Sequence, residues 1–161
     1  ERKKCRAAAC GQLTAELSKG KNIAMITLGD VSVYSTYMYV NQYVAEHGFE
    51  TEIIPGIPSF CSGAAAAQLP LMEGNESLVI VPSVRAEQQV EDAIAHYDNV
   101  VIMKAGGSIG RILELMKQYD RAENCATVIS CVGMKDEYIG PLDPERTYSY
   151  FTTVIIKKEK R

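Results

Sequence analysis

The chain has 161 residues, with 17 Lys and Arg against 20 Asp and Glu, so its formal net charge at pH 7 is −3. Hydrophobic residues make up 47% and charged residues 23%, a balance typical of a globular chain and not of a disordered one. The acidic balance disfavours a broad nucleic-acid surface, and no apolar run is long enough to span a bilayer, which predicts no membrane partner.

The first part of the chain alternates helical and strand-like patterns. Ala9, Leu13 and Leu17 recur at four-residue spacing, which predicts an amphipathic helix ended by Gly20. The predicted elements are a helix over 1–18, a strand over 23–27, a helix over 33–47, a strand over 50–54 and a helix over 61–68. This plan of strand, loop and helix indicates a parallel sheet of βαβ units.

The polar segment 72–76 predicts a domain boundary that divides the chain into 1–75 and 76–161. Beyond it, the predicted elements are a strand over 78–81, a helix over 86–96, a strand over 99–103, a helix over 109–119, a strand over 126–132, a polar loop over 133–144, a strand over 148–156 and a basic tail over 157–161. The fold class is therefore α/β, with two lobes.

A Gly-Asp turn follows the first predicted strand. Gly29 lets a ligand approach the backbone closely, and Asp30 either caps the following helix or accepts hydrogen bonds from a ligand. Tyr34, in the first predicted helical turn, either bonds a ligand or packs. Because ligands of open α/β sheets bind beyond the carboxyl ends of strands, four loops are candidates for one small-molecule site: 28–34, 55–60, 103–108 and 131–138.

The third of these loops contains Gly106, Gly107 and Ser108 before a helix. It either holds an anion on free backbone N–H groups or uses Ser108 as an N-cap. It lacks the ending of a P-loop, so nucleoside triphosphate hydrolysis is not expected.

Cysteine and histidine give no catalytic or metal-binding pattern. The five cysteines form no CxxC pair, which favours buried apolar roles in a reduced, cytoplasmic compartment. His47 and His96 lie near predicted helix ends with no ligand cluster around them, so no metal site is expected. No Ser-His-Asp or Cys-His arrangement is evident in the sequence.

Four blocks of residues, taken in order, resemble the tetrapyrrole (corrin/porphyrin) methylase family. They are Thr27–Asp30 with Tyr34–Thr36, then Pro55–Cys61 with Ala64–Ala67 and Leu69–Leu71, then Val101–Lys104, then Tyr150–Ile155. The chain departs from the family pattern at Val31, where Pro is usual, and at Pro58, where a small polar residue is usual. The Gly-rich loop that opens the family is not matched. We therefore expect a chain that starts within the sequence of a longer member and lacks its first strands.

The resemblance implies a two-lobed fold, with a mostly parallel sheet in the first lobe and a mixed sheet in the second. It also implies S-adenosylmethionine bound between the lobes and a homodimer. The residues expected beside the cofactor are Leu28, Gly29, Asp30, Val33, Tyr34, Ser59, Phe60, Met103, Lys104, Phe151 and Thr152.

The activity implied by the resemblance is methylation of a reduced tetrapyrrole, at C20 of precorrin-2 or its cobalt form, in cobalamin biosynthesis. The chemistry expected is direct methyl transfer without a protein nucleophile. Candidate bases are Tyr34, Lys104 and Glu137, and candidate cations for substrate carboxylates are Lys104, Arg111 and Lys135. Two alternatives stay open, a methylase of this fold with another substrate and a non-catalytic ligand-binding or interaction module.

Overall fold

The computed structural model describes residues 2–82 and 87–159, with no side chains described for residues 2–6. The predicted start of a helix at Ala86 and the end of the basic tail at Lys160 and Arg161 lie outside these ranges. Contacts divide the chain into two compact units, Glu1–Pro58 and Ser59–Arg161. The predicted division into lobes at residue 75 stays a prediction, and segment 59–75 lies with the second unit.

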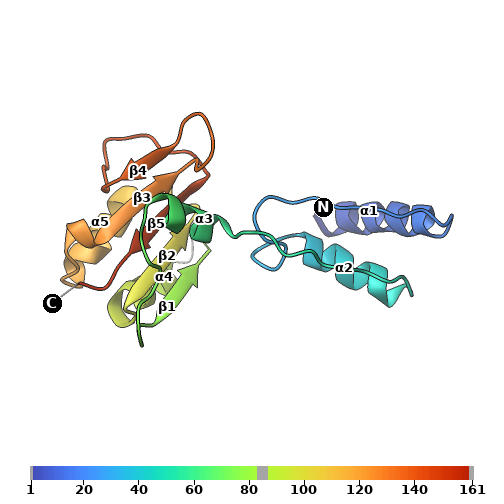
Figure 1. Cartoon of the computed structure of the whole chain (residues 1–161), viewed down its shortest axis with the longest axis horizontal. Coiled ribbons are helices and arrows are strands. Elements are labelled where there is room, and N and C mark those ends of the chain that lie inside the picture. Colours follow the sequence, from blue (N-terminus) through green and yellow to red (C-terminus); the bar gives the residue numbers. More distant parts are fainter. Residues whose placement is uncertain (1, 83–86, 160–161) are drawn as a thin grey trace. The chain divides into compact units, whose positions relative to one another are not determined.

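The first unit contains two helices, α1 (Arg2–Leu17) and α2 (Tyr37–Glu46), which contact each other (Figure 1). The helix α1 was predicted, and Cys10 is its buried residue among positions 7–17, where side chains are described. The helix α2 begins four residues later than predicted, because Tyr34 has a left-handed φ of 51° that cannot continue a helix. The Tyr37 N–H instead bonds Ser35 Oγ at 3.1 Å.

The strands predicted at 23–27 and 50–54 are not formed as a sheet in the described part of this unit. Neither segment pairs with another strand there, and a strand needs a partner for its backbone N–H and C=O groups. Their apolar side chains are correspondingly open to solvent, with Ile26 93% exposed and Ile54 76% exposed.

The second unit is built on a mixed five-stranded sheet in the order β1-β2-β5-β3-β4 (Figure 1). The strands are β1 (Leu78–Val81), β2 (Asn99–Met103), β3 (Ala126–Ser130), β4 (Tyr138–Gly140) and β5 (Thr152–Ile156). The β1–β2 pair is parallel, and the β2–β5, β3–β5 and β3–β4 pairs are antiparallel. The mixed sheet expected for this part of the chain is therefore confirmed.

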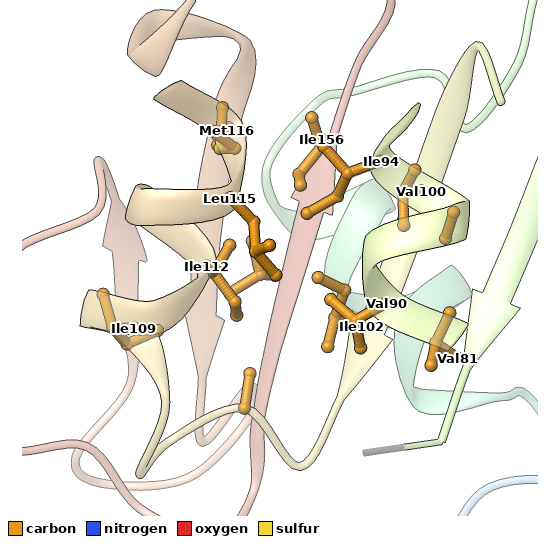
Figure 2. Close-up of a cluster of buried hydrophobic side chains, with 14 of the residues drawn as sticks. Val81, Val90, Ile94, Val100, Ile102, Ile109, Ile112, Leu115, Met116 and Ile156 are labelled. Atoms are coloured by element: carbon orange, nitrogen blue, oxygen red, sulfur yellow. The ribbon is translucent and has the colours of Figure 1, made fainter. Parts of the chain in front are cut away.

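One face of the sheet is covered by α4 (Glu87–His96) and α5 (Ile109–Gln118), with the short 3₁₀ turn η1 (Glu123–Cys125) leading into β3. Figure 2 shows side chains of both helices, such as Ile94 and Leu115, pointing toward Ile102 and Ile156 of the strands. All four side chains are fully buried, and each contributes roughly 1.5–3 kcal/mol by leaving water.

The opposite face is covered by α3 (Ser59–Ala66), which contacts β5. Gly63 lets this helix approach the sheet, because a Cβ there would lie 2.9 Å from Cγ2 of Ile129. Because strand residues alternate between faces, Val101 and Ile155 are buried on the side opposite to Ile102 and Ile156. The sheet is thus the middle of three layers, and α3 is tied to the strands that carry the candidate site.

Candidate functional site

The candidate site residues of the second unit gather at one end of the sheet. Met103 ends β2 and faces Thr153, the second residue of β5. Ser130 ends β3 and faces Thr152, the first residue of β5. Because β2 and β3 are both antiparallel to β5, their carboxyl ends flank its start, so the predicted grouping of Met103 with Thr152 is found.

Two residues at this end of the sheet have left-handed backbones although neither is glycine. Lys104, directly after β2, has a φ of 56°, and Cys131, directly after β3, has a φ of 54°. The Cys131 N–H bonds the Phe151 carbonyl at 2.9 Å, and the Ala105 N–H bonds the Thr152 carbonyl at 2.9 Å. The same strained bend therefore brackets the start of β5 on both sides, and such strain concentrates at functional sites.

The side chains around this bend combine aromatic surface with a cation. Lys104 Nζ lies 5.9 Å from the centre of the Tyr150 ring, within reach of a weak cation–π attraction. The Tyr150 and Phe151 rings meet edge to face at 5.5 Å. Tyr150 is 64% exposed and Phe151 51% exposed, so this aromatic pair is an open apolar surface beside a positive charge.

Two predicted site residues, Thr152 and Phe60, have side chains that are buried within the second unit. The Thr152 hydroxyl lies 2.8 Å from Ser130 Oγ and donates to the Ser149 carbonyl at 2.6 Å, and Thr152 is 1% exposed. Phe60 is 6% exposed within α3. Ser59, the first residue of α3, is exposed. The structure therefore gives Thr152 and Phe60 packing roles, whereas Ser59 stays open to solvent.

In the first unit, the Gly29–Asp30 turn lies against the Pro55–Ile57 loop. Asp30 Oδ1 accepts hydrogen bonds from the Ser32 N–H at 2.8 Å and from the Ser32 hydroxyl, and Oδ2 accepts one from the Gly56 N–H at 2.7 Å. These bonds, the Ser32 hydroxyl foremost, hold the pKa of the Asp30 carboxyl below its usual range. The expected helix-capping role of Asp30 is wrong, because α2 begins only at Tyr37.

The remaining predicted residues of the first unit, Leu28, Val33 and Tyr34, lie in the same turn as Asp30. Leu28 is 79% exposed, the Val33 N–H bonds the Asp30 carbonyl at 3.2 Å, and Tyr34 is 54% exposed. A cavity of about 670 Å³ runs along the first unit between the segments 22–27 and 50–54, and Gly29, Val31 and Gly56 line it as well. Its volume lies within the range of small-molecule sites.

The loop at 103–108 is held by close backbone packing. A Cβ on Gly106 would lie 2.2 Å from the Ser149 carbonyl oxygen, whereas one on Gly107 would meet no atom within 4 Å. Ser108 is the residue before α5, but its side chain makes no capping hydrogen bond. The structure therefore does not bear out the side-chain cap, and Gly106 instead fixes the segment that leads into β5.

The charged candidates near the site differ in how far they are already bonded. Arg111 is paired with Glu114 at 3.0 Å and with Glu87 at 2.7 Å, and these pairs occupy its guanidinium. Both carboxylates raise the pKa of Arg111, and Glu114 has the larger effect. Glu137 Oε2 accepts the Gly133 N–H at 2.7 Å. Lys104 and Lys135 are exposed, so they are the better candidates for contact with an anionic ligand.

The histidines bond helix carbonyls, and only some of the cysteines are buried as expected. His47, directly after α2, has Nδ1 2.7 Å from the Tyr43 carbonyl, and His96, the last residue of α4, has Nδ1 3.0 Å from the Asp92 carbonyl. Cys10 and Cys131 are buried, whereas Cys61 and Cys125 are only half-buried, and no disulfide forms between the cysteines whose side chains are described. Across residues 2–82 and 87–159, the structure groups no three His, Cys, Asp or Glu side chains that could hold a metal, and none of its helices is long and apolar enough to cross a membrane.

Three residues that the structure brings forward were not singled out from the sequence, although two of them, Gly56 and Cys131, lie in candidate loops. Gly56 had a signal in the sequence, because Pro-Gly marks a turn. Tyr150 lies in a matched family block next to Phe151. Cys131 opens the candidate loop 131–138, but nothing in the sequence marks its left-handed backbone.

Comparisons with known proteins agree with this fold and these blocks. The family model of the Tetrapyrrole (Corrin/Porphyrin) Methylases matches residues 2–143. A relative from Salmonella typhimurium, cobalt-precorrin-2 C(20)-methyltransferase, is 32% identical over 151 residues, which are 91% of this chain and 63% of the relative. The chain thus spans less than two thirds of that relative's length.

Two solved structures share the fold. The X-ray structure of a cobalt precorrin-4 methyltransferase superposes with a TM-score of 0.78 at 16% identity, over 92% of this chain and 69% of the other. The uroporphyrin-III C-methyltransferase from Thermus thermophilus, in complex with S-adenosylhomocysteine, superposes with a TM-score of 0.58 at 17% identity, over 80% and 62%. On the family match and the fold together, the chain belongs to the tetrapyrrole (corrin/porphyrin) methylase family.

Proposed function

We propose that this chain takes part in S-adenosylmethionine-dependent methylation of a reduced tetrapyrrole, at C20 of precorrin-2 or cobalt-precorrin-2, in cobalamin biosynthesis. The observation that carries the proposal is the 32% identity to cobalt-precorrin-2 C(20)-methyltransferase across 91% of the chain. The Salmonella protein's name supplies the substrate and the position of the methyl group. The complex of the Thermus protein with S-adenosylhomocysteine supports the cofactor.

The residues of the two loop clusters fit such a cofactor chemically. An adenosyl group needs apolar walls, and Leu28 and Phe151 offer exposed apolar surface next to turns of the backbone. The amino-acid end needs polar partners, and Ser59 is exposed at the first residue of α3. Met103 and Lys104, at the strained end of β2, would contribute backbone groups. We propose that the Gly29 turn and the Met103–Lys104 turn are cofactor-binding segments.

When bound, S-adenosylmethionine supplies a methyl group activated by a sulfonium centre. The chain's own contribution is to bind and orient the reactants and to keep water away, and such positioning can lower a barrier by roughly 7–11 kcal/mol. Direct transfer of this methyl group to the substrate requires no protein nucleophile. Lys104 and Lys135 would bind substrate carboxylates, and Tyr34 and Lys104 remain candidate bases.

The test is mass spectrometry of precorrin-2, with and without cobalt, after incubation with the chain and S-adenosylmethionine. A gain of one methyl group, mapped to C20, is expected with one of the two substrates. Calorimetric titration with S-adenosylhomocysteine separates the open alternatives. Binding without methylation would favour a non-catalytic module or another substrate, and no binding would count against methyl transfer by this chain.

We also propose a homodimer acting in the cytoplasm, as the family resemblance implies. Light scattering of the purified chain at several concentrations tests the assembly. A mass of one chain at every concentration would refute the dimer.

A further inference from the structure

One carboxylate holds two separate loops of the first unit together. Asp30 bonds Ser32 through Oδ1 and the Gly56 N–H, 26 residues away, through Oδ2 at 2.7 Å. A carboxylate offers about four acceptor sites, and donors from the protein already occupy three of them. Asp30 therefore has little capacity left for a ligand, although its type and place had suggested a direct contact.

We call the hydrogen bonds from Ser32 and Gly56 to the Asp30 carboxylate the clasp. Its distant partner, Gly56, is a position that cannot carry a side chain. A Cβ there would lie 2.1 Å from the Gly29 carbonyl oxygen and 3.4 Å from Cα of Asp30. Both atoms belong to the backbone, so rotation of a side chain cannot relieve the collision. Gly29 itself has a left-handed φ of 77°. The two loops thus pack backbone against backbone, and the Asp30 carboxylate bonds across the contact.

The clasp lies beside the long cavity of the first unit, whose lining includes Gly29 and Gly56. The spacing of the two loops therefore fixes where their backbone groups stand relative to that space and to any ligand that meets the turn.

We infer that Asp30 is a positioning residue. It acts through the Gly56 amide to hold the 55–57 loop and the Gly29 turn at one fixed spacing for the cofactor, and it does not bind the cofactor itself. This inference rests on the proposed function, which supplies the ligand.

Two substitutions break the clasp by different routes. Asp30→Asn keeps the size of the side chain, but its one acceptor oxygen cannot accept from both Ser32 and the Gly56 N–H. Gly56→Ala keeps the carboxylate and forces the loops apart. Gly11→Ala is the matched control, because Gly11 lies in α1 of the same unit with no atom within 4 Å of the added Cβ.

Calorimetric titration with S-adenosylhomocysteine measures the effect on the cofactor site. Misplacing groups by about 1 Å is costly, so we expect each clasp variant to lose affinity about tenfold or more and Gly11→Ala to match the unmodified chain. The double variant is expected to bind S-adenosylhomocysteine no more weakly than whichever single variant binds it less well, because both changes break the same connection. Unchanged affinity in Gly56→Ala, or losses that multiply in the double variant, would overturn the inference and assign Asp30 to direct contact.

Amide hydrogen exchange without cofactor provides a second readout. In Asp30→Asn the Gly56 amide is expected to exchange about tenfold faster or more, and the amides of α1 are expected to be unchanged. An unchanged rate at Gly56 would overturn the inference. If the unmodified chain fails to bind S-adenosylhomocysteine, the proposed function fails and the cofactor role of Asp30 with it. If it binds and Gly56→Ala binds equally well, the inference fails alone.

Discussion

Gly106→Ala probes how closely the start of β5 is held to the end of β2. The new Cβ would lie 2.2 Å from the Ser149 carbonyl oxygen, where carbon and oxygen normally stay about 3.3 Å apart. The Ser149 segment must therefore move by about 1 Å. Three residues later, the Thr152 carbonyl accepts the Ala105 N–H at 2.9 Å, and the Phe151 carbonyl accepts the Cys131 N–H at 2.9 Å.

A shift of that size stretches one or both of these bonds beyond hydrogen-bonding distance. Each bond contributes roughly 0.5–1.5 kcal/mol, so we expect the free energy of unfolding to fall by about 1–3 kcal/mol. Chemical denaturation monitored by circular dichroism measures it. Because Phe151 moves with the segment, affinity for S-adenosylhomocysteine is also expected to fall about tenfold or more.

Gly107→Ala is the control for this prediction, because a Cβ at the neighbouring position meets no atom within 4 Å. It is expected to change the free energy of unfolding by less than about 0.5 kcal/mol. If Gly106→Ala is as stable as Gly107→Ala, the close backbone contact does not hold β5 and the reasoning is refuted.

Three further predictions concern the second unit. Lys104→Gly should raise the free energy of unfolding by about 0.5–1 kcal/mol, because glycine relieves the strain of the left-handed φ of 56°. Lys104→Ala removes the same charge but keeps the strain, so it should not stabilise the chain. Equal effects of the two variants in chemical denaturation would argue against strain. The pKa of Asp98 is lowered to about 2 by the Ser77 N–H, then Lys158 and the Ser77 hydroxyl, so the stability it contributes is present above its ordinary pKa of 3.8 and is lost as the pH falls toward 2. The difference in melting temperature between the unmodified chain and Asp98→Asn should shrink over that range, and a constant difference would contradict this assignment. Ile112→Ala, at a fully buried position of α5, should lower the free energy of unfolding by about 2–5 kcal/mol, measured by chemical denaturation. Lys117→Ala, on the exposed side of α5, should lower it by less than about 1 kcal/mol. Similar losses in the two variants would show that the core side of α5 is not closely packed.

The strands of the second unit could be predicted from the sequence because their signals are local. The runs at Leu78–Val81 and Asn99–Met103 are apolar, rich in β-branched residues and bounded by turn residues, and both were predicted with the observed ends. The strand β4 was missed because it has three residues inside a polar loop. It is a strand only because Ile139 meets Ile129 of β3, a pairing that no local pattern reveals.

The sequence predicted which loops form the candidate site, but not the hydrogen bonds that join distant loops. The pattern of strand ends predicted the loops 28–34 and 103–108, and the resemblance named Gly29 and Met103 beside the cofactor. The structure groups Met103 with Phe151 and Thr152 as expected. The bond from Asp30 to the Gly56 amide depends on a distant part of the chain, so the residue type alone suggested a ligand contact. The shared crevice for both clusters stays a prediction.

The strand that is last along the chain, β5, lies in the middle of the sheet, between β2 and β3. During synthesis, the earlier strands can form only the β1–β2 and β3–β4 pairs, and isolated two-stranded pairs are marginally stable in water. Closure therefore waits for residues 152–156 to leave the ribosome, and the open edges of β2 and β3 are exposed to wrong partners until then. We expect folding of this unit to be slow and nearly all-or-none, with a nascent chain stopped before β5 prone to aggregate.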